Sequence, residues 1–133
     1  MPTKLSSTNR YTDIDLFFVP NPLTSDVPKK VDVNAVLRSC RHLVLLAEHE
    51  KPFHPEIGAG VRTYLFEPLT ILTASQLEDA ITDVINQYEP RADVISVDVI
   101  ADPDSNGYDV RIEINVLDIA VPISLEITLT RLR

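Results

Sequence analysis

The stretch Tyr108-Asp109-Val110-Arg111-Ile112-Glu113-Ile114-Asn115-Val116 decides the fold, because every second residue in it is apolar. Such alternation is typical of a β-strand with one buried face. Shorter stretches with the same pattern lie on either side, and Asn106-Gly107 before the central stretch is a hairpin-turn signal. We therefore predict an antiparallel meander of three to four strands. The flanking apolar positions are Ile95, Val97 and Val99 before it, and Ile123, Leu125, Ile127 and Leu129 after it.

A helix is predicted over 74–88, directly before these strands. Thr73 is the expected N-cap, Gln76 completes a capping box, and Pro90 ends the helix. One face of the helix is apolar and is the natural cover for the sheet, so the fold class is α+β. That face consists of Leu77, Ala80, Ile81, Val84, Ile85 and Tyr88.

Two further helices are predicted in the N-terminal half, over 34–48 and from Val61 to Phe66. Asp32 or Asn34 caps the first one. Its apolar residues span a wide arc, which must be covered by its own domain or by a partner. The prolines within 11–33 predict extended segments and turns there.

The whole chain has the size and composition of one folded domain. It has 133 residues, of which 44% are hydrophobic and 24% charged, so we expect a single domain over 1–133, with a flexible polar segment at 1–10. The net charge of −8 argues against binding to nucleic acid or to anionic membrane. The longest apolar run, Leu43 to Ala47, is far shorter than a membrane span.

The candidate metal sites are weak. Asp102 to Gly107, with Glu113, matches the calcium-loop pattern, but strands rather than helices flank it, so we read it as a turn. His49 and His54 miss the zinc-protease spacing by one residue. We therefore expect no metal.

No motif predicts a catalytic or cofactor site. The pair Gly58 and Gly60 lacks the dinucleotide-binding spacing, and the lone Cys40 lies on the apolar stripe of a helix, where a nucleophile is not expected. The sequence leaves open a glycosidase-type carboxylate pair among Glu56, Glu67 and Glu89, but the chain has no Trp and only four Phe and four Tyr to stack on sugars. We expect neither a catalytic site nor a cofactor.

Two features are candidate partner-binding sites. Glu89-Pro90-Arg91 joins the helix over 74–88 to the sheet. It is either a structural corner with an internal Glu89–Arg91 contact or a rigidly held arginine fork that binds a partner's carboxylates or carbonyls. The last strand, with Ile123, Leu125, Ile127 and Leu129, is an expected sheet edge that could accept a strand from another chain.

Four further segments occur together in a specific order and spacing, and together they carry a resemblance over about residues 11–131. The segments are Pro52-Phe53-His54-Pro55-Glu56-Ile57-Gly58, Leu65-Phe66-Glu67-Pro68, Leu72-Thr73-Ala74 and Tyr88-Glu89-Pro90-Arg91, and Tyr11-Thr12-Asp13-Ile14-Asp15 precedes them. The chain resembles the baseplate-wedge, sheath-initiator family of contractile phage tails, which type VI secretion and related injection machines share. His54 stands where some relatives carry an acidic residue.

The resemblance implies a structural protein of the virion baseplate, assembled in the host cytoplasm, and no enzyme. In the family the Glu-Pro-Arg element docks on a helical core bundle of wedge proteins, which maps onto Glu89, Pro90 and Arg91. The family's sheet joins the tail sheath by sharing strands, which points to 93–131 here. Hub proteins near the tube are further expected partners. Two alternatives remain: a peptidoglycan hydrolase, because relatives are often labelled tail lysozyme, and a free-standing adaptor that binds a regulatory protein.

Overall fold

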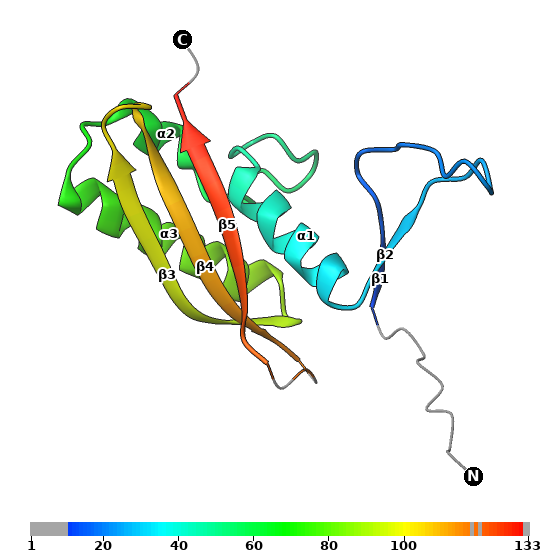
Figure 1. Cartoon of the computed structure of the whole chain (residues 1–133). Coiled ribbons are helices and arrows are strands. Elements are labelled where there is room, and N and C mark those ends of the chain that lie inside the picture. Colours follow the sequence, from blue (N-terminus) through cyan, green and yellow to red (C-terminus); the bar gives the residue numbers. More distant parts are fainter. Residues whose placement is uncertain (1–10, 118, 120, 132–133) are drawn as a thin grey trace.

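A computed structural model describes residues 11–117, 119 and 121–131. The segment 1–10, which the sequence predicts to be flexible, lies outside the described residues. The elements are, in chain order, β1 (Thr12–Ile14), β2 (Lys29–Val31), α1 (Val33–Leu45), α2 (Val61–Phe66), α3 (Ile71–Tyr88), β3 (Ala92–Asp102), β4 (Gly107–Val116) and β5 (Ile123–Thr130) (Figure 1).

The predicted meander is confirmed. β3, β4 and β5 form one antiparallel sheet in this order, and β1 pairs with β2 in a separate two-stranded ribbon. The central strand β4 is the most buried, because its apolar side chains Val110, Ile112, Ile114 and Val116 all face the helices and are 0–2% exposed. Figure 1 shows α3 behind the sheet, α1 beside it, and the β1–β2 ribbon farthest from β3. The fold is α+β, as predicted.

One strand departs from the simple alternation. A register shift between Val94 and Ser96 in β3 places one extra residue, Ile95, in the strand. Such a bulge reverses the side-chain alternation beyond it. Val94 therefore packs against the core, whereas Ile95 is 48% exposed. The prediction that Ile95 belongs to the apolar face is wrong for this reason.

Helix α3 covers the sheet, and Leu77, Ile81 and Ile85 are completely buried against it. The predicted cap, however, is wrong. The helix begins at Ile71, and Thr70 is the N-cap, whose Oγ1 accepts a hydrogen bond from the Thr73 amide at 3.1 Å. The Thr73 hydroxyl instead donates to the carbonyl of Pro68 at 2.9 Å. Local contacts with Pro68 and Thr70 thus place Thr73 inside the first turn.

Helix α1 packs against α3 and is shorter than the predicted range of 34–48. It ends at Leu45, because Leu46 turns to an extended conformation with φ −68° and ψ 125°. Asp32 occupies the predicted N-cap position, but its side chain makes no capping bond. Its Oδ1 accepts from the amide of Tyr11 at 3.4 Å instead, which ties the start of β1 to the start of α1. The short helix α2 matches the prediction.

The turn between β3 and β4 places two backbones unusually close. Asn106 has a positive φ of 52°, and Gly107 pairs with Asp102 across the hairpin. A Cβ on Gly107 would lie 2.1 Å from the carbonyl oxygen of Leu129 in β5. Glycine is therefore required for the three strands to meet here. Among the described residues, no helix is long and apolar enough to cross a membrane.

Candidate partner-binding site

The Arg91 corner, formed by Glu89, Pro90 and Arg91, joins α3 to β3. Glu89 is the C-cap of α3, and its amide bonds to the carbonyl of Ile85 at 2.8 Å. The carbonyl of Arg91 accepts from the amide of Leu117, at the end of β4, at 2.9 Å. Pro90 is exposed between them. The corner is thus fixed to the helix on one side and to the sheet on the other.

The guanidinium of Arg91 lies between two carboxylates of its own chain. On the inner side, Nε donates to Oε1 of Glu89 at 2.7 Å and Nη2 donates to Oε2 at 2.8 Å. On the outer side, Nη1 and Nη2 donate to the two carboxylate oxygens of Asp13 in β1, at 3.3 and 3.2 Å. The internal Glu89–Arg91 contact left open by the sequence is therefore present, together with a second carboxylate.

The inner pair is buried and the outer pair is partly open to solvent. The Glu89 side chain is 3% exposed, against 24% for Arg91 and 36% for Asp13. Burial raises the pKa of Glu89, but the hydrogen bonds from Arg91 and Ser39 outweigh it and hold that pKa below its usual value. The bond to Glu89 in turn raises the pKa of Arg91. Glu89 therefore stays ionised and positions Arg91. The contact between Arg91 and Asp13 is longer and more exposed to solvent.

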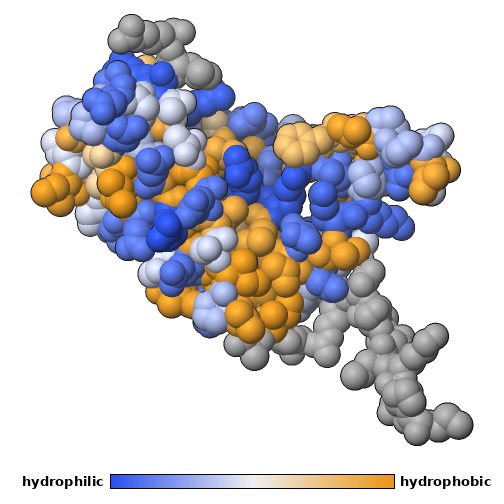
Figure 2. Space-filling view, in the orientation of Figure 1, coloured by the Kyte–Doolittle hydropathy of each residue, from blue (hydrophilic) through white to orange (hydrophobic). Residues whose placement is uncertain are grey.

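The segment after Asp13 extends this surface with apolar side chains. We call residues 15–28, between β1 and β2, the arm. The buried carboxylate of Asp15 fixes its base, because it accepts from Arg38 of α1 at 2.6 Å and pairs with Lys30 at 3.3 Å. Beyond it the arm carries exposed apolar residues (Figure 2). They are Leu16, Phe17, Phe18, Val19 and Leu23.

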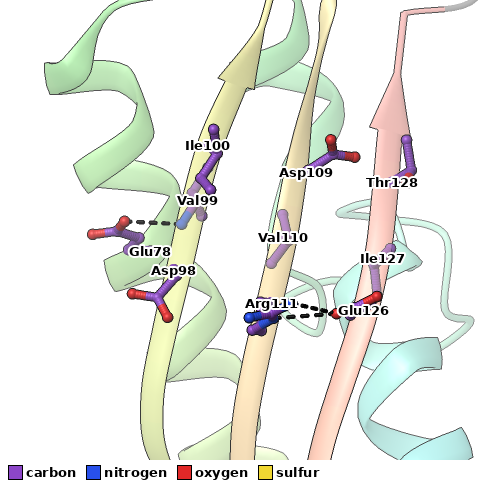
Figure 3. A pocket seen from close by; sticks show the side chains of 10 residues that line it. All are labelled: Glu78, Asp98, Val99, Ile100, Asp109, Val110, Arg111, Glu126, Ile127 and Thr128. Carbon is purple, nitrogen blue, oxygen red and sulfur yellow. Dashed lines mark hydrogen bonds and ion pairs between the residues drawn. The ribbon is translucent and has the colours of Figure 1, made fainter.

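The predicted sheet edge is present at β5, which pairs with β4 on one side only. Ile127 and Leu129 are buried, whereas Ile123 and Leu125 are half-buried although they face the helices. The outer face of the sheet is polar, and there Arg111 donates to Oε1 of Glu126 at 2.7 Å (Figure 3). β5 and the Arg91 corner are separate surfaces of one molecule.

The residues considered as catalytic or metal-binding candidates do not lie together in a reactive centre. Among the described residues, no group of three or more His, Cys, Asp or Glu is placed to hold a metal ion. Asp102 is the last residue of β3, and its Oδ1 accepts from the amide of Asp104 in the following turn at 3.1 Å. Burial raises the pKa of the Cys40 thiol to about 12. The His54 side chain bonds to that of Glu56, two residues further on, at 3.2 Å, and both side chains are exposed.

Two residues with structural importance escaped sequence reasoning. Asp13 lies 78 positions from Arg91 in the chain, so no local spacing connects them. Glu78 lies outside the apolar face predicted for its helix, but its Oε1 accepts from the amide of Val99 in β3 at 3.0 Å. Neither contact has a sequence signal beyond the side-chain charge.

An α+β domain with an open strand edge, a fixed ion-pair corner and exposed apolar side chains has features that are typical of subunits that bind other proteins. The particular family follows from comparison with known proteins. Residues 30–125 match the family described as "Baseplate wedge protein gp25", and the chain belongs to this family.

Relatives support this assignment. The baseplate wedge protein gp25 of Enterobacteria phage T4 is 32% identical over 108 residues, which are 81% of each chain. A chain in the six-fold symmetrised baseplate of the anti-feeding prophage superposes with a TM-score of 0.64 at 19% identity, over 90% of this chain and 85% of that one. A putative tail lysozyme from Geobacter sulfurreducens gives a TM-score of 0.66 at 19% identity, over 74% and 89%. The last two likenesses concern the fold.

Proposed function

We propose that this protein is a structural subunit of a contractile-tail baseplate that docks on the helical core of the wedge through the Arg91 corner and starts sheath assembly by strand addition at its sheet. The observation that carries this proposal is the membership of the gp25 family. The open edge of β5 supports the second part, because unpaired backbone groups on an edge strand accept a strand from another chain.

The geometry of the corner suggests how docking occurs. Arg91 is held by Glu89 on its inner side, so its direction is fixed before a partner arrives. Asp13 occupies the outer side, at longer distances and with more exposure. A carboxylate of a wedge protein could replace Asp13 at little cost, because exposed ion pairs contribute only about 0–1 kcal/mol. The apolar arm that follows Asp13 then adds hydrophobic contact area.

Catalysis is not part of the proposal. A glycosidase needs a general acid whose pKa is raised. A backbone hydrogen bond and His54 lower the pKa of Glu56, and Arg91 outweighs burial to lower that of Glu89. Both residues are therefore unsuited to donate a proton at neutral pH. A peptidoglycan-clearing activity that Glu56→Gln or Glu89→Gln abolishes would overturn this part of the proposal.

Affinity capture from cells that assemble the particle tests the docking. Tagged protein is expected to recover the wedge proteins and the sheath protein, identified by mass spectrometry. Arg91→Ala alone would leave the Glu89 carboxylate buried and unpaired, which destabilises the fold. The better variant is Glu89→Leu combined with Arg91→Met, because an apolar pair leaves no buried charge.

The double variant is expected to fold, to lose the wedge proteins and to keep the sheath protein. Its folding is checked by the protection of buried Cys40 from alkylation. Arg111→Ala is the matched control, because Arg111 also pairs with a carboxylate but on the exposed face of the sheet. Capture of wedge proteins at the native level by the folded double variant would refute the docking role.

A further inference from the structure

The two edges of the three-stranded sheet are not equivalent. At the β3 edge, the carboxylate of Glu78 on α3 accepts from the Val99 amide at 3.0 Å (Figure 3). In an antiparallel edge strand, alternate amides point away from the neighbouring strand, where an incoming strand would bond to them. Glu78 occupies one of these positions in the middle of β3. A strand that adds to β3 must first displace a charged acceptor, so this edge is closed.

The β5 edge has no such cover. Among the described residues, no side chain or loop bonds to the outward backbone groups of residues 123–130. Its helix-facing residue Leu125 is half-buried, whereas its partner in the central strand, Ile112, is completely buried. The apolar side of the sheet therefore continues to the edge and stops there uncovered.

Two hollows lie between β5 and the helices. The basic hollow, of about 270 Å³, surrounds Leu125 and is lined by Lys30, Asn34, Leu37, Arg38 and Arg41. The apolar hollow, of about 440 Å³, lies at the other end of the strand and contains Arg62 and Arg131. Its remaining lining is Leu45, Val61, Leu65, Phe66, Thr128, Leu129 and Thr130.

The charge of these hollows is opposite to that of the chain. The chain has a net charge of −8, yet the hollows hold five Lys or Arg side chains and no acidic one. Asp15 partly neutralises Lys30 and Arg38. Arg41, Arg62 and Arg131 have no carboxylate partner among the residues that the structure describes, although Arg131 stacks on Phe66 at 4.6 Å. By contrast, the charged lining of the hollow on the outer face of the sheet is one basic side chain, Arg111, and four acidic ones, which are Glu78, Asp98, Asp109 and Glu126.

We infer that the β5 edge is selective for an extended, acidic segment of a partner protein, whose backbone pairs with β5 and whose helix-facing carboxylates reach the basic and apolar hollows. This inference rests on the proposed strand addition and names the chemistry of the strand that is added. Leu125 and Leu129, which mark the two hollows, are four residues apart and face the same side. That spacing corresponds to roughly 13 Å along a strand. The matching carboxylates therefore lie four positions apart on the incoming segment.

Two other occupants fit the edge less well. Residues 1–10 of this chain contain Lys4 and Arg10 but no acidic residue, so the hollows would repel them. A second copy that paired β5 with β5 would bring two sets of cations together. Charge complementarity thus favours a partner segment over this chain itself.

Synthetic peptides test the selectivity. The probe is a fluorescein-labelled nine-residue peptide of alternating Thr and Val with Glu at positions 3 and 7, and its control carries Lys at these positions. Fluorescence polarisation at low salt is expected to show the Glu peptide binding roughly tenfold more tightly, as expected for a few exposed ion pairs. Amide chemical-shift changes are expected along β5 and not along β3.

Charge reversal provides the matched variants. Arg41 and Arg62 are exposed, so Arg41→Glu and Arg62→Glu are expected to fold, and the double variant should prefer the Lys peptide. Arg111→Glu, on the outer face, should keep the native preference. Equal binding of both peptides along β5 would overturn the acidic selectivity while leaving strand addition intact.

Failure of the proposed function has a different signature. No binding of either peptide, together with no sheath protein in the affinity capture, would overturn both strand addition and the selectivity. A second copy of the chain would be identified as the occupant if sedimentation detected self-association and only β5 amides changed their chemical shifts. That result would also overturn the inference.

Discussion

Arg91 donates Nε and Nη2, one side of its guanidinium, to Glu89, only two residues before it, through bonds of 2.7 and 2.8 Å to the two carboxylate oxygens. Exposed Pro90 links the two residues, and the pair closes the junction between α3 and β3. An arginine whose carboxylate partner is buried is held in one direction. The same contact thus has a structural role in the isolated chain and fixes the group that we propose to meet a partner.

The acid sensitivity of the fold is expected to depend on Glu89. Its pKa is lower in the folded chain than in the unfolded one, because the hydrogen bonds from Arg91 and Ser39 outweigh burial. A carboxyl group with a lowered pKa stabilises the fold above its unfolded pKa of about 4.3, and this contribution is lost as the pH falls through the folded value. Glu89→Gln should cost roughly 2 kcal/mol at pH 7, and the difference should shrink below pH 4.

Urea unfolding of the native chain and of Glu89→Gln between pH 7 and pH 3 measures the difference in their free energies of unfolding directly. Asp15, whose pKa is also lowered, is present in both proteins and drops out of the comparison. A pH-independent difference between them would contradict the assignment of a buried, ionised Glu89.

Loss of Glu78 is expected to open the β3 edge. Glu78→Ala removes the carboxylate that accepts from the Val99 amide and leaves outward backbone groups without cover. Sedimentation velocity at increasing concentration should then show more self-association than the native chain. Asp79→Ala, on the exposed side of the same helix turn, is the control. Equal sedimentation of the native chain and Glu78→Ala would show that Glu78 does not protect this edge.

Gly107→Ala is expected to destabilise the sheet. The new Cβ would lie 2.1 Å from the carbonyl oxygen of Leu129, so one of the two backbones must move. Overpacking of this kind costs about 1–3 kcal/mol, which thermal unfolding detects readily. Asp104→Ala, in the adjacent exposed turn, should change stability by less than about 0.5 kcal/mol. Equal melting temperatures of the two variants would argue against the close approach.

Tyr108→Phe is expected to keep or increase stability. Tyr108 is completely buried, and its hydroxyl makes no hydrogen bond of good geometry with any residue that the structure describes, although the side chain of Thr73 lies near it. An unpaired buried hydroxyl costs about 1–3 kcal/mol, and phenylalanine fills nearly the same space without it. Chemical denaturation of the two proteins checks this expectation. A marked loss of stability would instead indicate that the hydroxyl has a partner, such as a buried water.

Periodicity predicted much of the fold because it reports which face of an element is buried. The alternation in β4 and the stripe from Leu77 to Ile85 both lie where they were placed. The prediction from sequence failed where two nearby residues could take the same structural role. Thr70 and Thr73 are both acceptable caps, and only the contact with the Pro68 carbonyl decides between them. The extra residue in β3 lies at Val94-Ile95, two adjacent apolar residues, and the sequence does not decide which of the two belongs to the buried face.

The candidate site was predictable in its local part only. Glu89 and Arg91 are close in the chain, so their contact was one of two readings that the sequence allowed. The contact of Arg91 with Asp13 joins the corner before β3 to β1. The basic residues beside β5 come from β2, α1, α2 and the residue that follows β5. Such groupings depend on how the elements pack, which short-range patterns do not encode.

The closed β3 edge has a consequence for any sheet that this chain shares with strands of other chains. A sheet with two free edges can be extended on both sides and can sit anywhere in a row of strands. Because Glu78 binds the Val99 amide, we expect strand addition on the β5 side alone, which would make this subunit the terminal member of such a row. In a ring of these subunits, every β5 edge would face the same way around the ring. Strand addition to the ring would therefore proceed in one direction.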